Sequence, residues 1–302
     1  MKKMFVLASL ALVGVACSKS DDNGGGNNGG NSNNNGGNNQ VTPATAPAVY
    51  PTEKEGNDQN YSQTTYTLEN NKVKTVVRER YQNGVKDATA TRTTNVTYTD
   101  KKYPTVVEET YNGSFTNKTE YTYNEKNQIT EMKNTREGRT QVVKFEYNAE
   151  GKVSKAIHPT YQVSYEYPNA TTVVEKNSST PNSTNTYTIV NGNVTKFLQE
   201  SKDDLGVVRF TNTQEYEYNT AVKNPAASFE RRILDPSYFY NYSPYDANYS
   251  KNMYTKRTDS YNDHGVTNSR TYTYTYETND KGYPTKKTET FEGGNMVTTY
   301  TY

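Results

Sequence analysis

Few residues of this 302-residue chain have the types and spacing that catalysis needs. There are only two histidines: His158 precedes Pro159, and His264 lies in an Asn-Asp-His-Gly turn. Neither has a partner at metal-ligand spacing, and the chain has no His-Glu-x-x-His run, Gly-rich phosphate loop or Gly-x-Ser-x-Gly elbow. The single cysteine is Cys17. We therefore expect no enzymatic activity, no metal and no other cofactor.

Carboxylates are plentiful, and a pair of them about 5–10 Å apart can hydrolyse a glycoside. Most alternate with tyrosines along expected strands, which places them on a solvated face where cross-strand lysines pair with them. Examples are Glu108, Glu109, Glu120, Glu146, Glu166 and Glu217. Several aspartates offer oxygens suited to Ca²⁺ but lack the ligand number of an EF-hand, so solvated turns are expected. These are Asp203, Asp204, Asp263 and Asp280.

The first 17 residues have the pattern of an export signal. Lys2 and Lys3 give a positive start, residues 5–12 are apolar, and small residues precede Cys17. The apolar run is shorter than the roughly 20 residues that a membrane-spanning helix needs. This arrangement resembles the bacterial lipobox, although Gly14 stands where that motif usually has leucine. The resemblance implies cleavage after residue 16 and attachment to a membrane through lipid on Cys17.

The segment after the cysteine changes composition abruptly. Residues 19–22 read Lys-Ser-Asp-Asp, which resembles the short acidic signal that directs Bacteroidota lipoproteins to the outer face of the outer membrane. A Gly/Asn tract over residues 23–40 predicts a flexible tether. We expect a signal peptide over 1–16, a lipidated cysteine with a tether over 17–56, and a Tyr-rich β-repeat domain over 57–302. The expected localisation is the outer membrane, lipid-anchored and at the cell surface.

The composition favours a folded domain whose thin core is made largely of tyrosine. The formal net charge of +1 gives no field that would recruit nucleic acid. The chain contains 29 tyrosines and no tryptophan. A tyrosine buries a large ring while its hydroxyl reaches a polar partner or water. Because there is one cysteine, no internal disulfide is expected.

A weakly repeated unit runs through the body of the chain. Each unit begins with an aromatic-X-aromatic dyad, passes through a turn, and ends in a second strand of Val, Thr and charged residues. Alternation along a strand puts both rings of a dyad on one face. Asn191-Gly192 is a strong hairpin signal. The clearest dyads are Tyr121/Tyr123, Phe145/Tyr147, Tyr165/Tyr167 and Tyr216/Tyr218.

This unit, as in YTYNEKNQITEMK from Tyr121 and FEYNAEGKVSKAI from Phe145, resembles the YD-type repeat of Rhs-like surface proteins. It is more similar to a family of YD-repeat-like lipoproteins of Bacteroidota, in which a meander follows a lipoprotein signal and a polar tether. The resemblance covers about residues 61–302 and implies architecture, not an activity. Asn124, Asn148 and Asn219 stand where the repeat usually has aspartate.

The expected fold class is all-β. We predict an antiparallel meander of repeated Tyr-rich hairpins that forms a large bent sheet or two packed sheets. Residues 226–234 are the one stretch with a helical period. The terminal VTTYTY also occurs as a pattern in outer-membrane barrels, but we do not expect a barrel. A barrel that spans the outer membrane would not need a lipid anchor, and the strands lack a continuous apolar band that could face lipid.

An irregular insertion at about residues 224–256 interrupts the repeat. Aromatic residues crowd it, with Pro236 and Pro244 among them. One interpretation is a plug that covers an end of the thin core. The other is a binding site, because loops commonly carry binding residues. The candidate binding residues are Tyr238, Phe239, Tyr240, Tyr242, Tyr245 and Tyr249.

These features predict a surface-exposed outer-membrane lipoprotein with a non-catalytic binding or interaction domain. Its partner would be a protein or an envelope or extracellular polymer, because extended sheets offer broad surfaces rather than deep pockets. A glycan-binding component of a polysaccharide-uptake system is one alternative, marked by two or three coplanar tyrosines around a polar groove. A second is an envelope lipid carrier, marked by a cavity of Val and Tyr. A glycosidase-like enzyme would need a close Glu pair inside a cleft.

Overall fold

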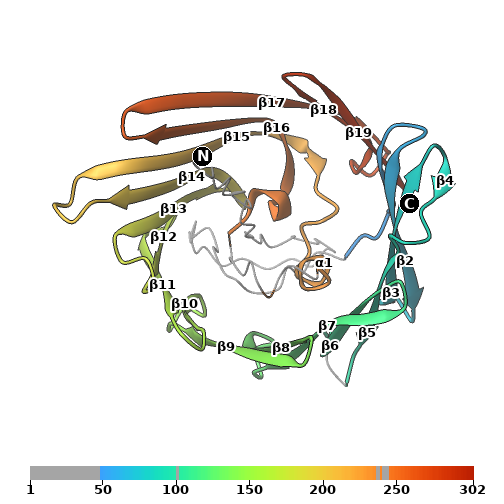
Figure 1. Cartoon of the computed structure of the whole chain (residues 1–302), viewed down its shortest axis with the longest axis horizontal. Helices are drawn as coiled ribbons and strands as arrows, with labels where there is room; N and C mark the ends of the chain where they lie inside the picture. The colour runs from blue at the N-terminus through green and yellow to red at the C-terminus, as the bar shows by residue number, and fades with distance from the viewer. Residues whose placement is uncertain (1–47, 100–101, 236–238, 240–244) are drawn as a thin grey trace, which may run out of the picture.

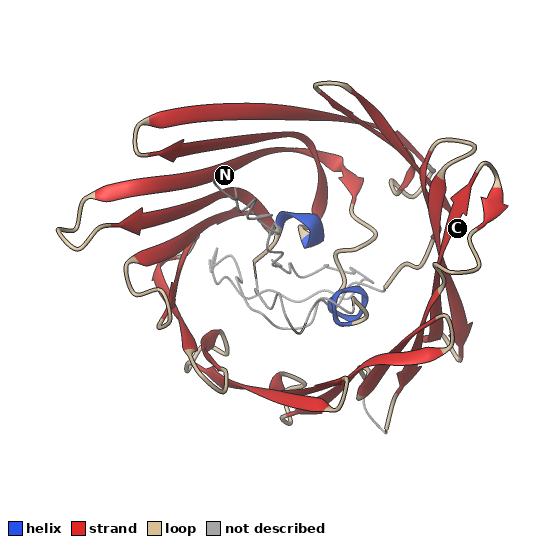
Figure 2. Cartoon of the chain, viewed as in Figure 1, coloured by secondary structure: helices blue, strands red, loops and turns tan. Residues whose placement is uncertain are grey.

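The computed structural model describes residues 48–99, 102–235, 239 and 245–302. Strands make up most of this part of the chain (Figure 2). The first strands are β1 (Thr52–Gly56), β2 (Tyr61–Glu69), β3 (Lys72–Gln82), β4 (Val85–Lys86), β5 (Arg92–Thr97), β6 (Val106–Tyr111), β7 (Ser114–Tyr123), β8 (Ile129–Arg136), β9 (Arg139–Tyr147) and β10 (Val153–Ile157). The others are β11 (Gln162–Asn169), β12 (Thr172–Asn177), β13 (Ser183–Val190), β14 (Asn193–Lys202), β15 (Val208–Lys223), β16 (Asn252–Asp263), β17 (Val266–Thr278), β18 (Pro284–Phe291) and β19 (Gly294–Thr301). Helix α1 (Phe229–Ile233) and the 3₁₀ turn η1 (Ala247–Tyr249) lie between β15 and β16.

The sheet closes on itself. Neighbouring strands pair antiparallel all the way round, with the short β4 folding back on β3 while β3 pairs with β5. Strand β1 completes the ring, because Lys54 lies opposite Thr299 of β19 on one side and opposite Gln63 of β2 on the other. Figure 1 shows this ring from one end. The strand β1 belongs to residues that we assigned to the tether, so the sheet begins at Thr52 rather than at residue 57.

The prediction of an all-β antiparallel fold is confirmed. The finer prediction of an open bent sheet or two packed sheets was wrong, and so was our exclusion of a closed barrel, because eighteen strands form a barrel. Closure pairs the edges that an open sheet would leave exposed. Alternation along each strand is the same for open and closed sheets, so the sequence pattern does not distinguish them.

The aromatic dyads and many of the valines face the lumen of the barrel. Val73 and Val76 of β3, Met132 of β8 and Val143 of β9 are completely buried there. The rings of the dyads contact one another or the insertion; for example, the ring centroids of Tyr216 and its dyad partner are 6.4 Å apart. The core is therefore a layer on the inner face of the wall, which is how a chain poor in aliphatic residues buries apolar surface.

A hydrogen bond recurs in six of the units. The second tyrosine of a dyad donates its hydroxyl proton to a main-chain carbonyl near the start of the preceding strand, 14 to 24 residues upstream. We call these contacts the tyrosine links. The donor and acceptor residues, with O···O distances of 2.6 to 3.0 Å, are Tyr123–Pro104, Tyr147–Ile129, Tyr167–Val153, Tyr218–Val194, Tyr276–Tyr254 and Tyr302–Pro284.

The residue after the dyad shapes the turn that follows. The Asn148 side-chain oxygen accepts from the N–H groups of Glu150 at 3.1 Å and Lys152 at 2.9 Å. The turn ends at Gly151, whose φ of +78° suits glycine. Asn124 makes the same pair of contacts in its own turn. This explains why the repeat needs an Asx side chain at this position.

The outer face of the barrel carries charge. Six cross-strand ion pairs lie on this face. Their residues alternate along the strands with residues that face the lumen. They are Glu120–Lys133, Glu146–Lys155, Glu166–Lys176, Lys196–Glu215, Glu217–Lys256 and Glu277–Lys286. Among the residues that the structure describes, no helix is long and apolar enough to cross a membrane.

Candidate binding site in the barrel lumen

Two elements of the insertion between β15 and β16, helix α1 and the 3₁₀ turn η1, lie inside the ring (Figure 1). Helix α1 begins after Ser228, whose hydroxyl accepts from the N–H of Arg231 at 3.2 Å. The wall holds both ends of the helix: the Tyr98 hydroxyl donates to the Glu230 carboxylate, and the Tyr121 hydroxyl donates to the carbonyl of Ile233 at 3.1 Å. The helix predicted near residues 226–234 is therefore present, and tyrosines of the wall fix its position.

The second half of the insertion is held in the same way from the other side of the barrel. The hydroxyls of Tyr245 and Tyr167 are 2.7 Å apart, and the Tyr245 ring lies 5.6 Å from the ring of Tyr187. Ser250 accepts from the N–H of Val194 at 3.1 Å. Burial raises the pKa of Tyr167 to about 12, so this hydroxyl stays protonated at neutral pH.

Arg231 joins the insertion to the strand that closes the barrel. Its guanidinium forms an ion pair with Glu53 of β1, donates to the carbonyl of Val49 at 3.3 Å, and lies 4.7 Å from the centre of the Tyr66 ring. Burial opposes the charge on Arg231, but the nearby Glu53 outweighs it and keeps the pKa of Arg231 above its usual value. The pair is therefore ionised.

A cavity of about 210 Å³ lies between the insertion and the wall, beside this ion pair. We call it the lumen pocket. The insertion contributes Arg231 and Asn248, and β1 contributes Glu53. Strands β16 to β19 contribute the remaining polar and aromatic groups that matter here, which are Tyr254, Tyr276, Lys287 and Tyr300.

Two of the tyrosine hydroxyls that line the lumen pocket already donate within the protein. The Tyr276 hydroxyl donates to the carbonyl of Tyr254 at 2.7 Å, and the Tyr254 hydroxyl donates to the side-chain oxygen of Asn248 at 2.9 Å. Burial raises the pKa of Tyr254, Tyr276 and Tyr300, so all three are neutral hydroxyls. The arrangement can hold a small ligand rich in acceptor atoms against tyrosine rings.

The two adjacent lysines of β18 face opposite sides of the wall. Lys286 points outward and its ammonium lies 2.9 Å from the carboxylate of Glu277. Lys287 lies in register between Tyr276 and Thr298, and it lines the lumen pocket. Thr298 is only 2% exposed, which identifies this face as the inner one.

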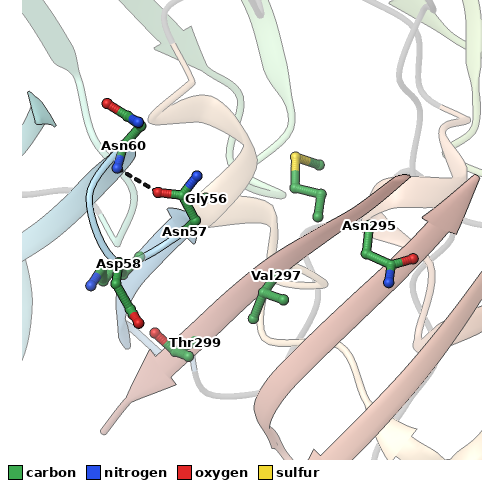
Figure 3. Close-up of a pocket in the computed structure, with 9 residues that line it drawn as sticks. Gly56, Asn57, Asp58, Asn60, Asn295, Val297 and Thr299 are labelled. Atoms are coloured by element: carbon green, nitrogen blue, oxygen red, sulfur yellow. Dashed lines mark hydrogen bonds between the residues drawn. The ribbon is translucent and has the colours of Figure 1, made fainter. Parts of the chain in front are cut away.

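A second pocket of about 430 Å³ lies where the ring closes (Figure 3). Asn57, Asp58 and Asn60 follow β1, and Asn295 and Thr299 come from β19. The Asn57 side-chain oxygen accepts from the N–H of Asn60 at 2.6 Å, so it already serves the turn. This pocket is lined by residues of β1, of the turn after it and of β19, and among the described residues its lining contains no ion pair and no tyrosine.

The structure places three of the six predicted binding aromatics in the barrel interior. Phe239, Tyr245 and Tyr249 are 3%, 2% and 9% exposed. Tyr238, Tyr240 and Tyr242 lie outside the described residues, as does Cys17. The aromatic side chains that can be placed are packed rather than presented to solvent, and a binding role for the six residues stays a prediction.

The predicted carboxylate pattern holds for four of the six glutamates, which pair with lysines on the outer face. Glu109 differs: it is 7% exposed and lies in β6 on the same face as the buried Val107. Burial raises the pKa of Glu109 despite the nearby Arg92. Within the described part of the chain, no three His, Cys, Asp or Glu side chains gather as metal ligands.

Sequence reasoning missed Glu53, Arg231 and Lys287. Alternation along the strand could have indicated Lys287, because two adjacent lysines in a strand must face opposite sides of the sheet. The structure confirms this, since Lys287 lies opposite Tyr276 of β17. The other two needed the fold, since 178 residues separate Arg231 from Glu53.

No protein-family model and no curated protein sequence matches the chain. Among solved structures, a porin-like protein from Bacteroides uniformis aligns with a TM-score of 0.45 and 15% identity over 86% of this chain and 98% of that one. One from Bacteroides vulgatus aligns with a TM-score of 0.43 and 10% identity over 84% and 98%. TcdB2-TccC3 without its hypervariable C-terminal region aligns with a TM-score of 0.32 and 16% identity over 81% of this chain and 12% of that chain.

Proposed function

We propose that the chain is an outer-membrane lipoprotein, held at the cell surface by lipid on Cys17, whose barrel is a non-catalytic binding module. The barrel stands in water, and its lumen pocket takes a small polar ligand. The observation that carries this proposal is the division of the wall: charged pairs lie outside, while tyrosines, the insertion and the lumen pocket lie inside.

The charged outer face supports a barrel that stands in water. Lys196 and Glu215 have side-chain exposures of 43% and 58%, and Lys256 and Glu217 have 42% and 67%. A lysine facing the middle of a bilayer costs roughly 2–4 kcal/mol in a transmembrane barrel. Several such residues on the outer face of one barrel strongly disfavour its insertion into a bilayer. Lipid on an acylated cysteine would instead hold this domain at a membrane.

The filled lumen argues against transport through the barrel. Phe229 packs edge-on against the Tyr103 ring with centroids 5.1 Å apart, and Ile233 and Leu234 are fully buried. The same packing gives less support to an envelope lipid carrier, because the described insertion residues occupy space that an acyl chain would need. We expect no channel activity in a planar bilayer.

A glycan-binding role is the second candidate, and the lumen pocket favours it. Three tyrosine rings, those of Tyr254, Tyr276 and Tyr300, border the cavity together with the amide of Asn248. Sugars bind through stacked rings and many hydrogen bonds, so this combination suits one sugar unit. The proposal of a protein or polymer partner on the outer surface rests instead on the broad charged wall.

Metabolic labelling with a clickable fatty acid tests the anchor. The wild-type chain should incorporate the label, and Cys17→Ser should not. Detection of both proteins outside the cytoplasm, in the envelope or the medium, is the control that both are produced and exported. Proteinase K added to intact cells should remove the wild-type barrel. Absence of label on the wild-type protein would remove the lipoprotein proposal, and full protection from protease would remove the surface location.

A binding screen tests the module. The Cys17→Ser chain, purified without lipid, is titrated by thermal shift with single sugars and with soluble envelope polysaccharides, and is used to capture partners from intact cells. If a single sugar raises the melting temperature in a saturable way, the ligand binds in the lumen pocket. If only long polymers do so, the binding surface is the outer face of the barrel. Failure of all these ligands and of capture would contradict a binding module.

A further inference from the structure

We infer that the lumen pocket recognises a small monocarboxylate, whose carboxylate binds Lys287 and whose body lies against Tyr276 and Tyr300. This inference rests on the proposed ligand-binding function and specifies its chemistry. Three observations carry it: the Lys287 ammonium group without an ion pair, the Tyr300 hydroxyl without a hydrogen bond among the described residues, and a cavity of limited size.

Lys287 is the lysine of this strand that faces inward. Among the residues that the structure describes, it makes no ion pair and no hydrogen bond, whereas Lys286 pairs with Glu277. A half-exposed ammonium group that forms no ion pair within the protein remains available to an anionic ligand, which would form charge-assisted hydrogen bonds with it. A structural lysine would be expected to have a carboxylate opposite, as the outward lysines do.

The neighbouring donors point to the same kind of ligand. The Tyr300 hydroxyl lines the pocket and forms no hydrogen bond with any described residue. The side chain of Asn248 is already engaged, because its amide oxygen accepts from Tyr254 and the side chain also interacts with the carboxylate of Asp246. Lys287 and Tyr300 therefore present donors, and a carboxylate is a pure acceptor with about four lone-pair sites.

The charge of the pocket selects a monoanion. Glu53 and Arg231 neutralise each other in their ion pair, so Lys287 carries the remaining charge of the lining. The carboxylates of Glu55 and Glu289 lie outside the lining and act on Tyr300 and Tyr276, which adds to the preference for a ligand with a single negative charge. Charge-assisted hydrogen bonds of this kind are about twice as strong as neutral ones. A dianion would leave a second charge without a cation in a partly desolvated site.

The size of the pocket selects a small ligand. Its volume is about 210 Å³. This is below the range of about 300–1,000 Å³ typical of drug-sized ligands. A single oxidised sugar ring, which has one carboxylate and several hydroxyls, fits both the volume and the tyrosine walls.

Titration with glucuronate and glucose tests the inference, because the two probes have similar size and hydroxyls but only glucuronate carries a carboxylate. We expect saturable glucuronate binding by the Cys17→Ser chain at pH 7, measured by calorimetry or ligand-observed NMR, and at least about tenfold weaker glucose binding. Lys287→Met should weaken glucuronate by at least about tenfold, and Lys287→Arg should retain most of the affinity.

Lys286→Met is the matched control, because it removes an adjacent lysine from the opposite face and should leave glucuronate affinity unchanged. Circular dichroism establishes that each variant is folded. Equal affinity for glucose and glucuronate, no effect of Lys287→Met, or no saturable glucuronate binding would each overturn the carboxylate inference. Binding of glucose alone would do so while leaving the proposed binding module in place.

Discussion

The hydroxyl of Tyr147 on β9 donates to the main-chain carbonyl of Ile129 on β8, with an O···O distance of 2.6 Å. The same link recurs around the wall, always from the second aromatic of a dyad to the preceding strand. Phenylalanine supplies the same ring without the hydroxyl, so these contacts give a reason for tyrosine at this position. The ring packs in the lumen and the hydroxyl satisfies a carbonyl.

Removal of one tyrosine link should lower stability by a modest amount. We expect Tyr147→Phe to reduce the free energy of unfolding by about 1 kcal/mol, because the ring stays and the carbonyl of Ile129 loses a donor. Urea denaturation followed by circular dichroism measures it. Tyr261→Phe is the control, since Tyr261 is 44% exposed, and it should change stability by less than about 0.5 kcal/mol. Equal effects of both substitutions would contradict a structural role for the link.

The local parts of this fold could be predicted from the sequence. Alternation gives the strands and the shared face of Tyr121 and Tyr123, since side chains along a strand have a period of two. Turn chemistry gives the hairpins: Asn191 and Gly192 both have positive φ, 52° and 78°, as a type I′ turn requires. These signals lie within a few residues of one another, and the structure agrees with them.

Closure and the direction of some side chains could not be predicted. The ring depends on the pairing of Thr52 with Thr301, which are almost a whole domain apart in the chain. Glu109 looks like any other glutamate beside β-branched residues, yet it faces inward because it shares the face of Val107. Its carboxylate lies 3.7 Å from the guanidinium of Arg92 on the neighbouring strand β5, and the alternation pattern does not contain that pairing.

The ion pair of Glu53 and Arg231 should contribute strongly to closure. Glu53→Gln leaves the Arg231 side chain, which is 8% exposed, without its counter-ion. Breaking a buried pair in this way typically costs about 3 kcal/mol. We expect a loss of that order in urea denaturation. Glu55→Gln is the control, because Glu55 is exposed in the same strand, and it should change stability by less than about 0.5 kcal/mol.

A double-mutant cycle separates the pair from its parts. Arg231→Met alone and the double variant Glu53→Gln/Arg231→Met complete it, and we expect a coupling energy of at least about 1 kcal/mol. Additive effects of the two substitutions would show that the two side chains stabilise the barrel independently.

Glu175 should make the stability depend on pH. Its carboxylate lies in β12 and accepts from the Asn185 amide at 2.7 Å and the Tyr187 hydroxyl at 3.4 Å, with no ion pair among the described residues. Desolvation raises the pKa of Glu175 in the folded state. A raised folded pKa means that this group favours the fold most below its unfolded pKa of about 4.3 and that this contribution is lost as pH rises through the folded pKa.

We therefore expect Glu175→Gln to increase the free energy of unfolding at pH 8 relative to the wild type, and to flatten the dependence on pH between about 4.5 and 8. Urea denaturation at several pH values measures both effects. Glu166→Gln is the control, because Glu166 is 54% exposed and pairs with Lys176 on the outer face. A loss of stability at pH 8 in Glu175→Gln would show that the hydrogen bonds of the carboxylate outweigh its desolvation.

Tyr245 distinguishes a packed insertion from a binding surface. It is 2% exposed, contacts the rings of Tyr165 and Tyr187, and shares a hydrogen bond with Tyr167. Truncation of a large buried aromatic side chain leaves a cavity that costs about 3–5 kcal/mol, so Tyr245→Ala should destabilise the whole barrel by that amount. Tyr245→Phe keeps the ring and should cost about 1 kcal/mol. If Tyr245→Ala instead left the unfolding curve unchanged and reduced only ligand or partner capture, the insertion would be a recognition element and not part of the core.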